Sequence, residues 1–145
     1  MLHGECLCGA VAFEIGGRTP TLYQCHCALC RKQSGAGASV ATIVSKDSFR
    51  WLRGESNISS WIKDTGFRSD FCATCGAPVP NPLRAFPYVW VPVGLLDDAP
   101  GLAIGLQVFM RSKAAWDTVV GPGIAYEAAP DLQEFIRLLH SEPTG

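Results

Sequence analysis

The sequence lacks the features that mark membrane-spanning, secreted and nucleic-acid-binding proteins. No apolar run approaches the roughly 18 residues of a transmembrane helix, and the first residues have no basic region leading into an uninterrupted apolar stretch. The 12 basic and 13 acidic residues give a net charge of -1, with no long run of either sign. We therefore expect a cytoplasmic protein in a reducing compartment, with neither a nucleic acid nor a membrane as partner.

Several common catalytic motifs are also missing. The chain has no H-E-x-x-H zinc motif, no G-x-S-x-G nucleophile turn and no glycine-rich phosphate loop. A deaminase-type zinc site fits poorly, because neither C-x-x-C pair follows a proline. There is no internal repeat, low-complexity tract or convincing linker, so the 145 residues are expected to form one domain.

Short apolar runs bounded by glycine, proline, asparagine and aspartate predict a mainly β protein. The predicted strands are Ala10–Ile15, Thr21–Cys25, Ser39–Val44, Phe49–Leu52, Ile58–Ile62, Phe67–Phe71, Tyr88–Val93 and Leu102–Phe109. One helical turn is predicted at Ser112–Trp116, and an amphipathic C-terminal helix at Asp131–His140. The four prolines of Ala77–Pro87 predict a loop rather than a central strand.

Seven cysteines are the distinctive feature of the chain, and they gather in three clusters. These are Cys6 and Cys8, then Cys25, Cys27 and Cys30, then Cys72 and Cys75. An odd number at close spacing in a reducing compartment favours metal ligation over disulfides. Both C-x-C and C-x-x-C place two sulfurs on one side of the chain, so each pair can supply two ligands of a tetrahedral zinc.

Two divisions of these thiols satisfy zinc chemistry. In the first, the outer pairs, Cys6/Cys8 and Cys72/Cys75, form a four-thiolate site and the middle cluster is a three-thiolate site. In the second, Cys27/Cys30 and Cys72/Cys75 form a zinc ribbon that leaves the other three thiols out. The spacing favours the first division, because the pairs of the ribbon lie much farther apart than the roughly 15–20 residues usual for ribbons.

A three-thiolate zinc has an open coordination position, which is typical of a catalytic rather than a structural site. With three anionic ligands, it suits binding and deprotonating an external thiol better than making hydroxide from water. His26 is interpreted as a core or supporting histidine, because strand alternation directs it away from its cysteine neighbours. Arg31 and Lys32 follow the last cysteine and are candidates to bind a carboxylate of that thiol.

Four segments, in order, resemble the glutathione-dependent formaldehyde-activating enzyme family, which includes centromere protein V and belongs to the Mss4-like zinc superfamily. They are GECLCGAVAFEI, CHCALCRKQSGA, FCATCGAPV and VPVGLLDD. The resemblance implies a mainly β, tent-like fold of short antiparallel sheets around zinc, with a core over about 4–116 and a tail with a helix over 117–145. Near LAIGLQVFM many relatives have a histidine, whereas this chain has Gln107.

The resemblance also implies two zinc ions per chain. Cys6, Cys8, Cys72 and Cys75 match the structural zinc ligands of the family, and Cys25, Cys27 and Cys30 match the catalytic zinc ligands. The implied activity is that of a carbon–sulfur lyase, the condensation of glutathione with formaldehyde to S-hydroxymethylglutathione.

Three functional hypotheses follow for this chain. The leading one is a zinc enzyme that joins a glutathione-like thiol to formaldehyde or a related aldehyde, or runs the reverse reaction. The second is a non-catalytic, zinc-stabilised module that binds a protein partner, for which an exposed apolar surface around RAFPYVW would be favourable. The third is a metal-buffering or redox-sensing role for the middle cysteines. The sequence makes no prediction of oligomeric state.

Overall fold

The computed structural model of the chain describes residues 1–97 and 99–141. The chain forms two compact units. The first unit comprises residues 1–17 and 43–99, and the second comprises 18–42 and 100–145, of which the last four lie outside the described residues. No helix in the described part of the chain is both long enough and apolar enough to span a bilayer. The expected single domain over 1–145 stays a prediction.

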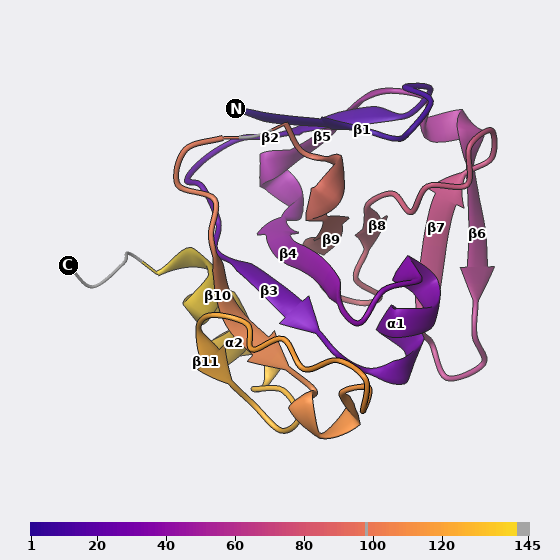
Figure 1. Cartoon of the computed structure of the whole chain (residues 1–145). Helices are drawn as coiled ribbons and strands as arrows, with labels where there is room; N and C mark the ends of the chain where they lie inside the picture. Colours follow the sequence, from indigo (N-terminus) through magenta and orange to yellow (C-terminus); the bar gives the residue numbers. More distant parts are fainter. Residues whose placement is uncertain (98, 142–145) are drawn as a thin grey trace. The chain divides into compact units, whose positions relative to one another are not determined.

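The first unit is built from short antiparallel sheets (Figure 1). One sheet has the order β1-β2-β5, and two further strand pairs are β6-β7 and β8-β9. The strands are β1 (Leu2–Glu5), β2 (Ala12–Ile15), β5 (Phe49–Arg53), β6 (Ile58–Ile62), β7 (Arg68–Cys72), β8 (Asn81–Pro82) and β9 (Tyr88–Pro92). Three 3-10 turns also belong to this unit: η1 (Lys46–Ser48), η2 (Glu55–Asn57) and η3 (Val93–Leu95).

Aromatic packing holds the core of this unit together. Phe13 of β2 is fully buried, stacks on Phe49 with ring centroids 5.5 Å apart, and meets Trp51 edge-on. Gly4 lies opposite Phe13 in the β1–β2 register, where a Cβ atom would come within 2.5 Å of the Phe13 ring. The absence of a side chain at Gly4 therefore lets the ring fill the space above β1.

The second unit contains both α-helices. Its strands are β3 (Leu22–Cys25), β10 (Ile104–Val108) and β11 (Ile124–Ala125), and β4 (Ser39–Ser45) continues from this unit into the first. β3 pairs antiparallel with β4, whereas β10 pairs parallel with both β3 and β11. The helices are α1 (Ala28–Ser34) and α2 (Leu132–His140), and the 3-10 turn η4 covers Met110–Ser112.

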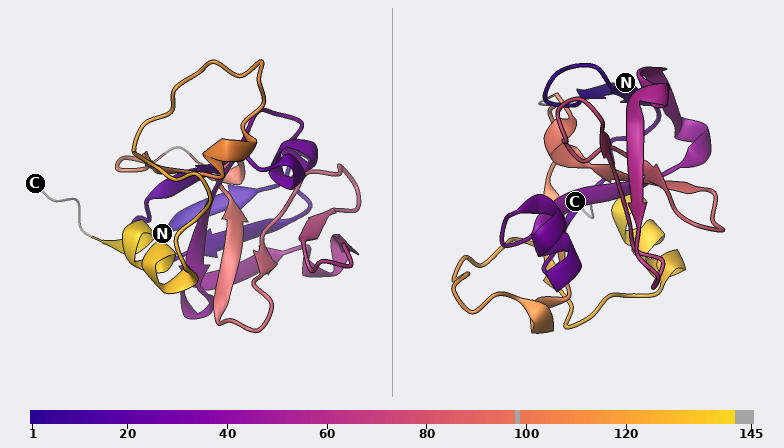
Figure 2. Two further views of the ribbon diagram at one scale, coloured as in Figure 1. Left: turned by 90° about the horizontal axis from the view of Figure 1, so that it is seen from below. Right: turned by 90° about the vertical axis from the view of Figure 1, so that its right-hand side faces the viewer.

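α2, yellow in Figures 1 and 2, packs against the sheet of its own unit. The ring of Phe135 meets Tyr23 of β3 edge-on at 4.7 Å, and the Thr21 N–H donates to the Leu139 carbonyl. Asp131 caps the helix, since its side chain accepts a hydrogen bond from the Glu134 N–H. The predicted C-terminal helix is therefore confirmed, with the apolar stripe facing the sheet.

The mainly β fold with short sheets and one short C-terminal helix is confirmed, and all eight predicted strands exist with small shifts at their ends. One local prediction was wrong, and one helix was missed. The helical turn lies at Met110–Ser112 rather than Ser112–Trp116, because Phe109 takes a positive φ of 57° and its carbonyl accepts from the Ser112 N–H. No helix was predicted at Ala28–Ser34, where α1 forms.

Candidate metal centres

The outer cysteine pairs lie together in the first unit and form what we call the four-thiol cluster: Cys6, Cys8, Cys72 and Cys75. All four sulfurs lie within 4.8 Å of one another. The Cys6–Cys8 and Cys8–Cys72 sulfur separations are 3.7 and 3.8 Å. A tetrahedral zinc with Zn–S bonds of about 2.3 Å requires sulfurs about 3.8 Å apart, so this donor set fits zinc.

Two tight turns aim these sulfurs at one another. The first follows β1, and the second follows β7, whose last residue is Cys72. Each turn has a glycine after its second cysteine, Gly9 and Gly76, with φ values of 82° and 78°. This left-handed conformation suits glycine and lets the chain reverse next to the thiols.

Backbone N–H groups contribute to the electrostatics of this cluster. The Ala77 N–H is the largest influence on Cys75 and, with the other neighbours, lowers the pKa of its thiol to about 6. At Cys8 the Ala10 N–H also favours the thiolate, but desolvation and three neighbouring thiols outweigh it and raise the pKa to about 11. The cluster thus contains both an easily ionised and a proton-retaining thiol, and a bound cation would displace the remaining protons.

The middle cysteines also converge, within the second unit, into what we call the three-thiol cluster: Cys25, Cys27 and Cys30. Cys25 ends β3, Cys27 is the N-cap of α1, and Cys30 lies in the first turn of that helix. Their sulfurs lie within 4.8 Å of one another. Among the described residues, no histidine, cysteine or carboxylate joins them as a fourth donor.

α1 forms because the cysteines themselves contribute to its ends. The Cys27 sulfur accepts a hydrogen bond from the Cys30 N–H at 3.3 Å, in the way that a serine or aspartate oxygen caps other helices. Gly35, at a φ of 70°, closes the helix by donating to the Arg31 carbonyl at 2.8 Å. Glycine after basic residues was the available sequence signal, but a cysteine N-cap is not one of the usual helix starts.

Protons are unevenly distributed in the three-thiol cluster. The Cys25 thiol donates to Cys30 and lowers the pKa of Cys30 to about 6, with Ser39 also favouring that thiolate. The same hydrogen bond, with desolvation, raises the pKa of Cys25, and desolvation raises the pKa of Cys27. Ser39 was not predicted as part of the site; it lies opposite Cys25 in the β3–β4 register, which the sequence does not reveal.

The two basic candidates are placed differently. Arg31 is half-buried, and among the described residues its Nε has no hydrogen-bond partner. Lys32 is exposed. This buried, unpaired Nε belongs to the charged guanidinium, which is the type of group that binds a carboxylate.

His26, which lies between Cys25 and Cys27 in the chain, forms a buried polar network with Gln107. The His26 Nε2 and the Gln107 Oε1 lie 2.6 Å apart. The Gln107 amide nitrogen donates to Gln24 Oε1 at 2.6 Å and to the Pro122 carbonyl at 3.0 Å. Because both amide hydrogens are used, the Gln107 oxygen must accept, so His26 donates from Nε2. His26 is thus a buried histidine of the core, which agrees with one of the two interpretations of its place in the sequence.

The family model described as glutathione-dependent formaldehyde-activating enzyme matches residues 1–112, which include both cysteine clusters. The chain belongs to this family. The crystal structure of a Rhodobacter sphaeroides protein is also similar, with a TM-score of 0.56 and 24% sequence identity over 70% of this chain and 98% of that chain. At this identity the likeness concerns the fold. No curated protein sequence matches the chain significantly.

The formaldehyde-activating family is thus identified from the first 112 residues, and α2 lies beyond the matched region. Both thiol clusters have donor sets that suit zinc, and both lie in the matched region.

Proposed function

We propose that this protein is a zinc-dependent enzyme of the carbon–sulfur lyase type. A thiol, glutathione or one similar to it, adds to formaldehyde or a related carbonyl compound and gives an S-hydroxymethyl adduct, or the adduct is cleaved in reverse. The observation that carries the proposal is the three-thiol cluster, in which three sulfurs converge and no fourth donor joins them in the described part of the chain. Three protein ligands are typical of catalytic zinc.

In this proposal Cys25, Cys27 and Cys30 hold the reactive zinc. Zinc bound there would keep an incoming thiol deprotonated near neutral pH. The protein residues fix the geometry: β-pairing holds Cys25, and α1 holds the other two sulfurs. In the forward reaction a sulfur–carbon bond forms, the carbonyl double bond becomes a single bond, and the proton of the thiol ends on the carbonyl oxygen.

Recognition of the thiol is assigned to basic residues. Within residues 1–97 and 99–141 the Arg31 Nε has no hydrogen-bond partner, and Lys32 is exposed beside it in the chain. A thiol that carries carboxylates, such as glutathione, would be bound by these charges. We expect a small thiol and a small aldehyde as the partners of the protein, in the cytoplasm, and no nucleic acid.

We further propose that Cys6, Cys8, Cys72 and Cys75 hold a second, structural zinc. Their sulfur separations suit a tetrahedral ion, and two of them, Cys6 and Cys72, are buried in an apolar cluster with Val11 and Val79. A closed four-thiolate site in such surroundings stabilises the fold rather than reacting.

The alternative of a protein-interaction module has weaker support. It was tied to an exposed apolar surface around residues 84–90, where Ala85, Phe86 and Pro87 are exposed whereas Val89 is buried. A short exposed turn with one aromatic side chain does not make the extended apolar patch that marks a docking surface.

The deciding experiment compares Cys27→Ser with Cys8→Ser, one from each thiol cluster, in protein purified without a chelator. Zinc content is measured by elemental analysis, and thiol-dependent formaldehyde consumption is measured with glutathione. Cobalt substitution, read by thiolate-to-cobalt charge-transfer absorption, reports each cluster without relying on activity.

We expect about two zinc ions in the wild-type chain. Cys27→Ser should keep its circular dichroism spectrum, lose the cobalt signal of one cluster, and lose turnover. Cys8→Ser should lower the unfolding midpoint. Full turnover in Cys27→Ser, or a wild-type chain that holds one zinc even after anaerobic loading, would contradict the assignment. A tight protein partner without thiol-dependent turnover would favour the interaction module.

A further inference from the structure

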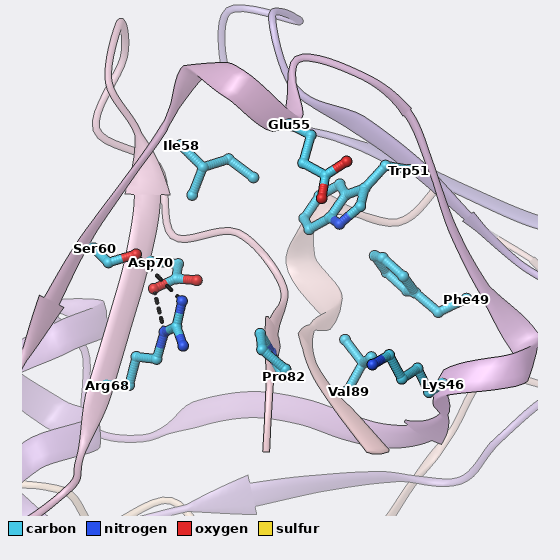
Figure 3. Close-up of a pocket in the computed structure, with 10 residues that line it drawn as sticks. All are labelled: Lys46, Phe49, Trp51, Glu55, Ile58, Ser60, Arg68, Asp70, Pro82 and Val89. Carbon is cyan, nitrogen blue, oxygen red and sulfur yellow. Dashed lines mark hydrogen bonds and ion pairs between the residues drawn. The ribbon is translucent and has the colours of Figure 1, made fainter. Parts of the chain in front are cut away.

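A cavity in the first unit is lined by no residue of either thiol cluster. It has a volume of about 550 Å³, within the range of small-molecule sites. Figure 3 shows two walls, one from η1, β5 and η2 and the other from β6 and β7, with residues of β8 and β9 between them. No sulfur of either cluster lines it.

The first wall provides an aromatic surface. Phe49 and Trp51 are half-buried, and their rings meet edge-to-face at 4.9 Å. Phe13 supports both rings from the core, so they are held in place rather than free to rotate. Val89 and Ile58 add apolar surface to the cavity. Such a lining favours a ligand with an apolar, preferably aromatic, body.

Charged groups lie at both ends of this aromatic wall. Figure 3 shows Lys46 at the Val89 end and the Glu55 carboxylate in front of the Trp51 indole. Among the described residues, neither the Lys46 ammonium nor the Glu55 carboxylate has a hydrogen-bond or ion-pair partner. The site therefore offers one free cation and one free anion, separated by the aromatic rings.

The charged residues of the opposite wall, Arg68 and Asp70, are paired with each other. The Arg68 Nε donates to Asp70 Oδ1 at 2.8 Å, and the Asp70 side chain is only 5% exposed. The Arg68 Nη2 lies 3.4 Å from Ser60 Oγ. Because the charges of Arg68 and Asp70 neutralise each other, we assign recognition of a charged ligand to Lys46 and Glu55.

From these features we infer that the cavity binds a short peptide of two or three residues with an apolar side chain. The peptide carboxylate pairs with Lys46, its ammonium lies between Glu55 and the Trp51 ring, and its apolar side chain contacts the aromatic wall. The length is chosen from the wall between the two charged residues: β5 has five residues and extends about 13 Å at roughly 3.3 Å per residue. A di- or tripeptide spans at most about 7–11 Å, so it fits along this wall.

This inference does not depend on the proposed enzymatic function. It concerns residues of the first unit, whereas the proposed reactive zinc belongs to the second. Cys27→Ser, which should abolish thiol-dependent turnover, is therefore expected to leave peptide binding unchanged, and failure of one proposal can be told from failure of the other.

The test uses the tripeptide Ala-Phe-Ala with the zinc-loaded full chain, and follows the Trp51 indole N–H by heteronuclear NMR. An N-acetylated form lacks the ammonium, and a C-terminal amide lacks the carboxylate. We expect saturable shifts at Trp51, with each modified peptide binding about fivefold more weakly, as for exposed ion pairs.

Variants assign each charge separately. Lys46→Met should weaken binding of the unmodified tripeptide about fivefold and leave binding of the C-terminal amide unchanged. Glu55→Gln should weaken binding of the unmodified tripeptide about fivefold and leave binding of the N-acetylated peptide unchanged. Lys63→Met and Asp64→Asn, in the turn between β6 and β7, are the matched controls and should have no effect. No saturable shift at Trp51, or equal binding of all three peptides, would overturn the proposal.

Discussion

Replacement of Gln107 by leucine should destabilise the second unit although no charge is removed. Gln107 is 1% exposed and links His26, Gln24 and the Pro122 carbonyl through three hydrogen bonds. The His26 ring is also buried, and among the described residues its Nδ1 has no partner. Gln107→Leu would therefore leave the imidazole without any hydrogen bond.

The magnitude follows from these contacts. An unpaired buried donor costs about 1–3 kcal/mol, and the other two hydrogen bonds contribute about 1 kcal/mol each. Greater apolar burial of leucine offsets part of this, by about 1–2 kcal/mol. We expect a net loss of about 2 kcal/mol in the free energy of unfolding, measured by urea denaturation of zinc-loaded protein and followed by circular dichroism.

Gln133→Leu is the matched control, because the same chemical change is made on the exposed side of α2. It should change the free energy of unfolding by less than about 0.5 kcal/mol. If Gln107→Leu were as mild as Gln133→Leu, the buried network would not stabilise the fold.

Three further predictions concern the turns and the metal sites. Gly54→Ala should lower the free energy of unfolding by over about 3 kcal/mol, because a Cβ would lie 2.0 Å from the Ala10 carbonyl oxygen. Gly76→Ala, with the same φ of 78° and open space around it, should lower it by only about 1 kcal/mol. Urea denaturation measures both values, and equal losses would contradict this explanation. Zinc binding to the three-thiol cluster should release protons and strengthen as pH rises, because the pKa values of Cys25 and Cys27 are raised and their thiols are protonated at neutral pH. Titration calorimetry in two buffers of different ionisation enthalpy counts the protons released. A count of zero would refute this prediction. Removal of zinc by a strong chelator should lower the unfolding temperature of the first unit by well over 10 °C, as followed by scanning calorimetry, and an unchanged temperature would speak against a structural zinc.

Much of the fold could be predicted because the strands carry strong local signals. Ile58–Ile62 was predicted with its observed bounds, since β-branched and aromatic residues there end at a turn with Asp64 and Gly66. The C-terminal helix was also clear from its apolar stripe and its cap. These elements depend on neighbours in the chain, which a sequence displays directly.

What was missed depends on contacts distant in the sequence or on unusual chemistry. β1 and β11 are short, and each exists through pairing with a strand elsewhere, β2 and β10 respectively. α1 was missed because its N-cap is a cysteine. For the site, spacing left two divisions of the thiols open, and the structure brings the cysteines together in the four-plus-three grouping. The pairing of Gln107 with His26 spans 81 residues and has no local signal.

The two thiol clusters differ in how much of the chain each one needs. The three-thiol cluster is complete within a six-residue segment, whereas Cys8 and Cys72 of the four-thiol cluster are separated by 64 positions. Closing the longer loop costs about 2 kcal/mol more in chain entropy. During synthesis the middle segment can therefore capture a metal ion while most of the protein is still unmade, and the outer cysteines meet only after Cys75 has emerged. The order in which the two clusters are completed thus follows the order of the chain, with the three-thiol cluster assembled before the four-thiol cluster.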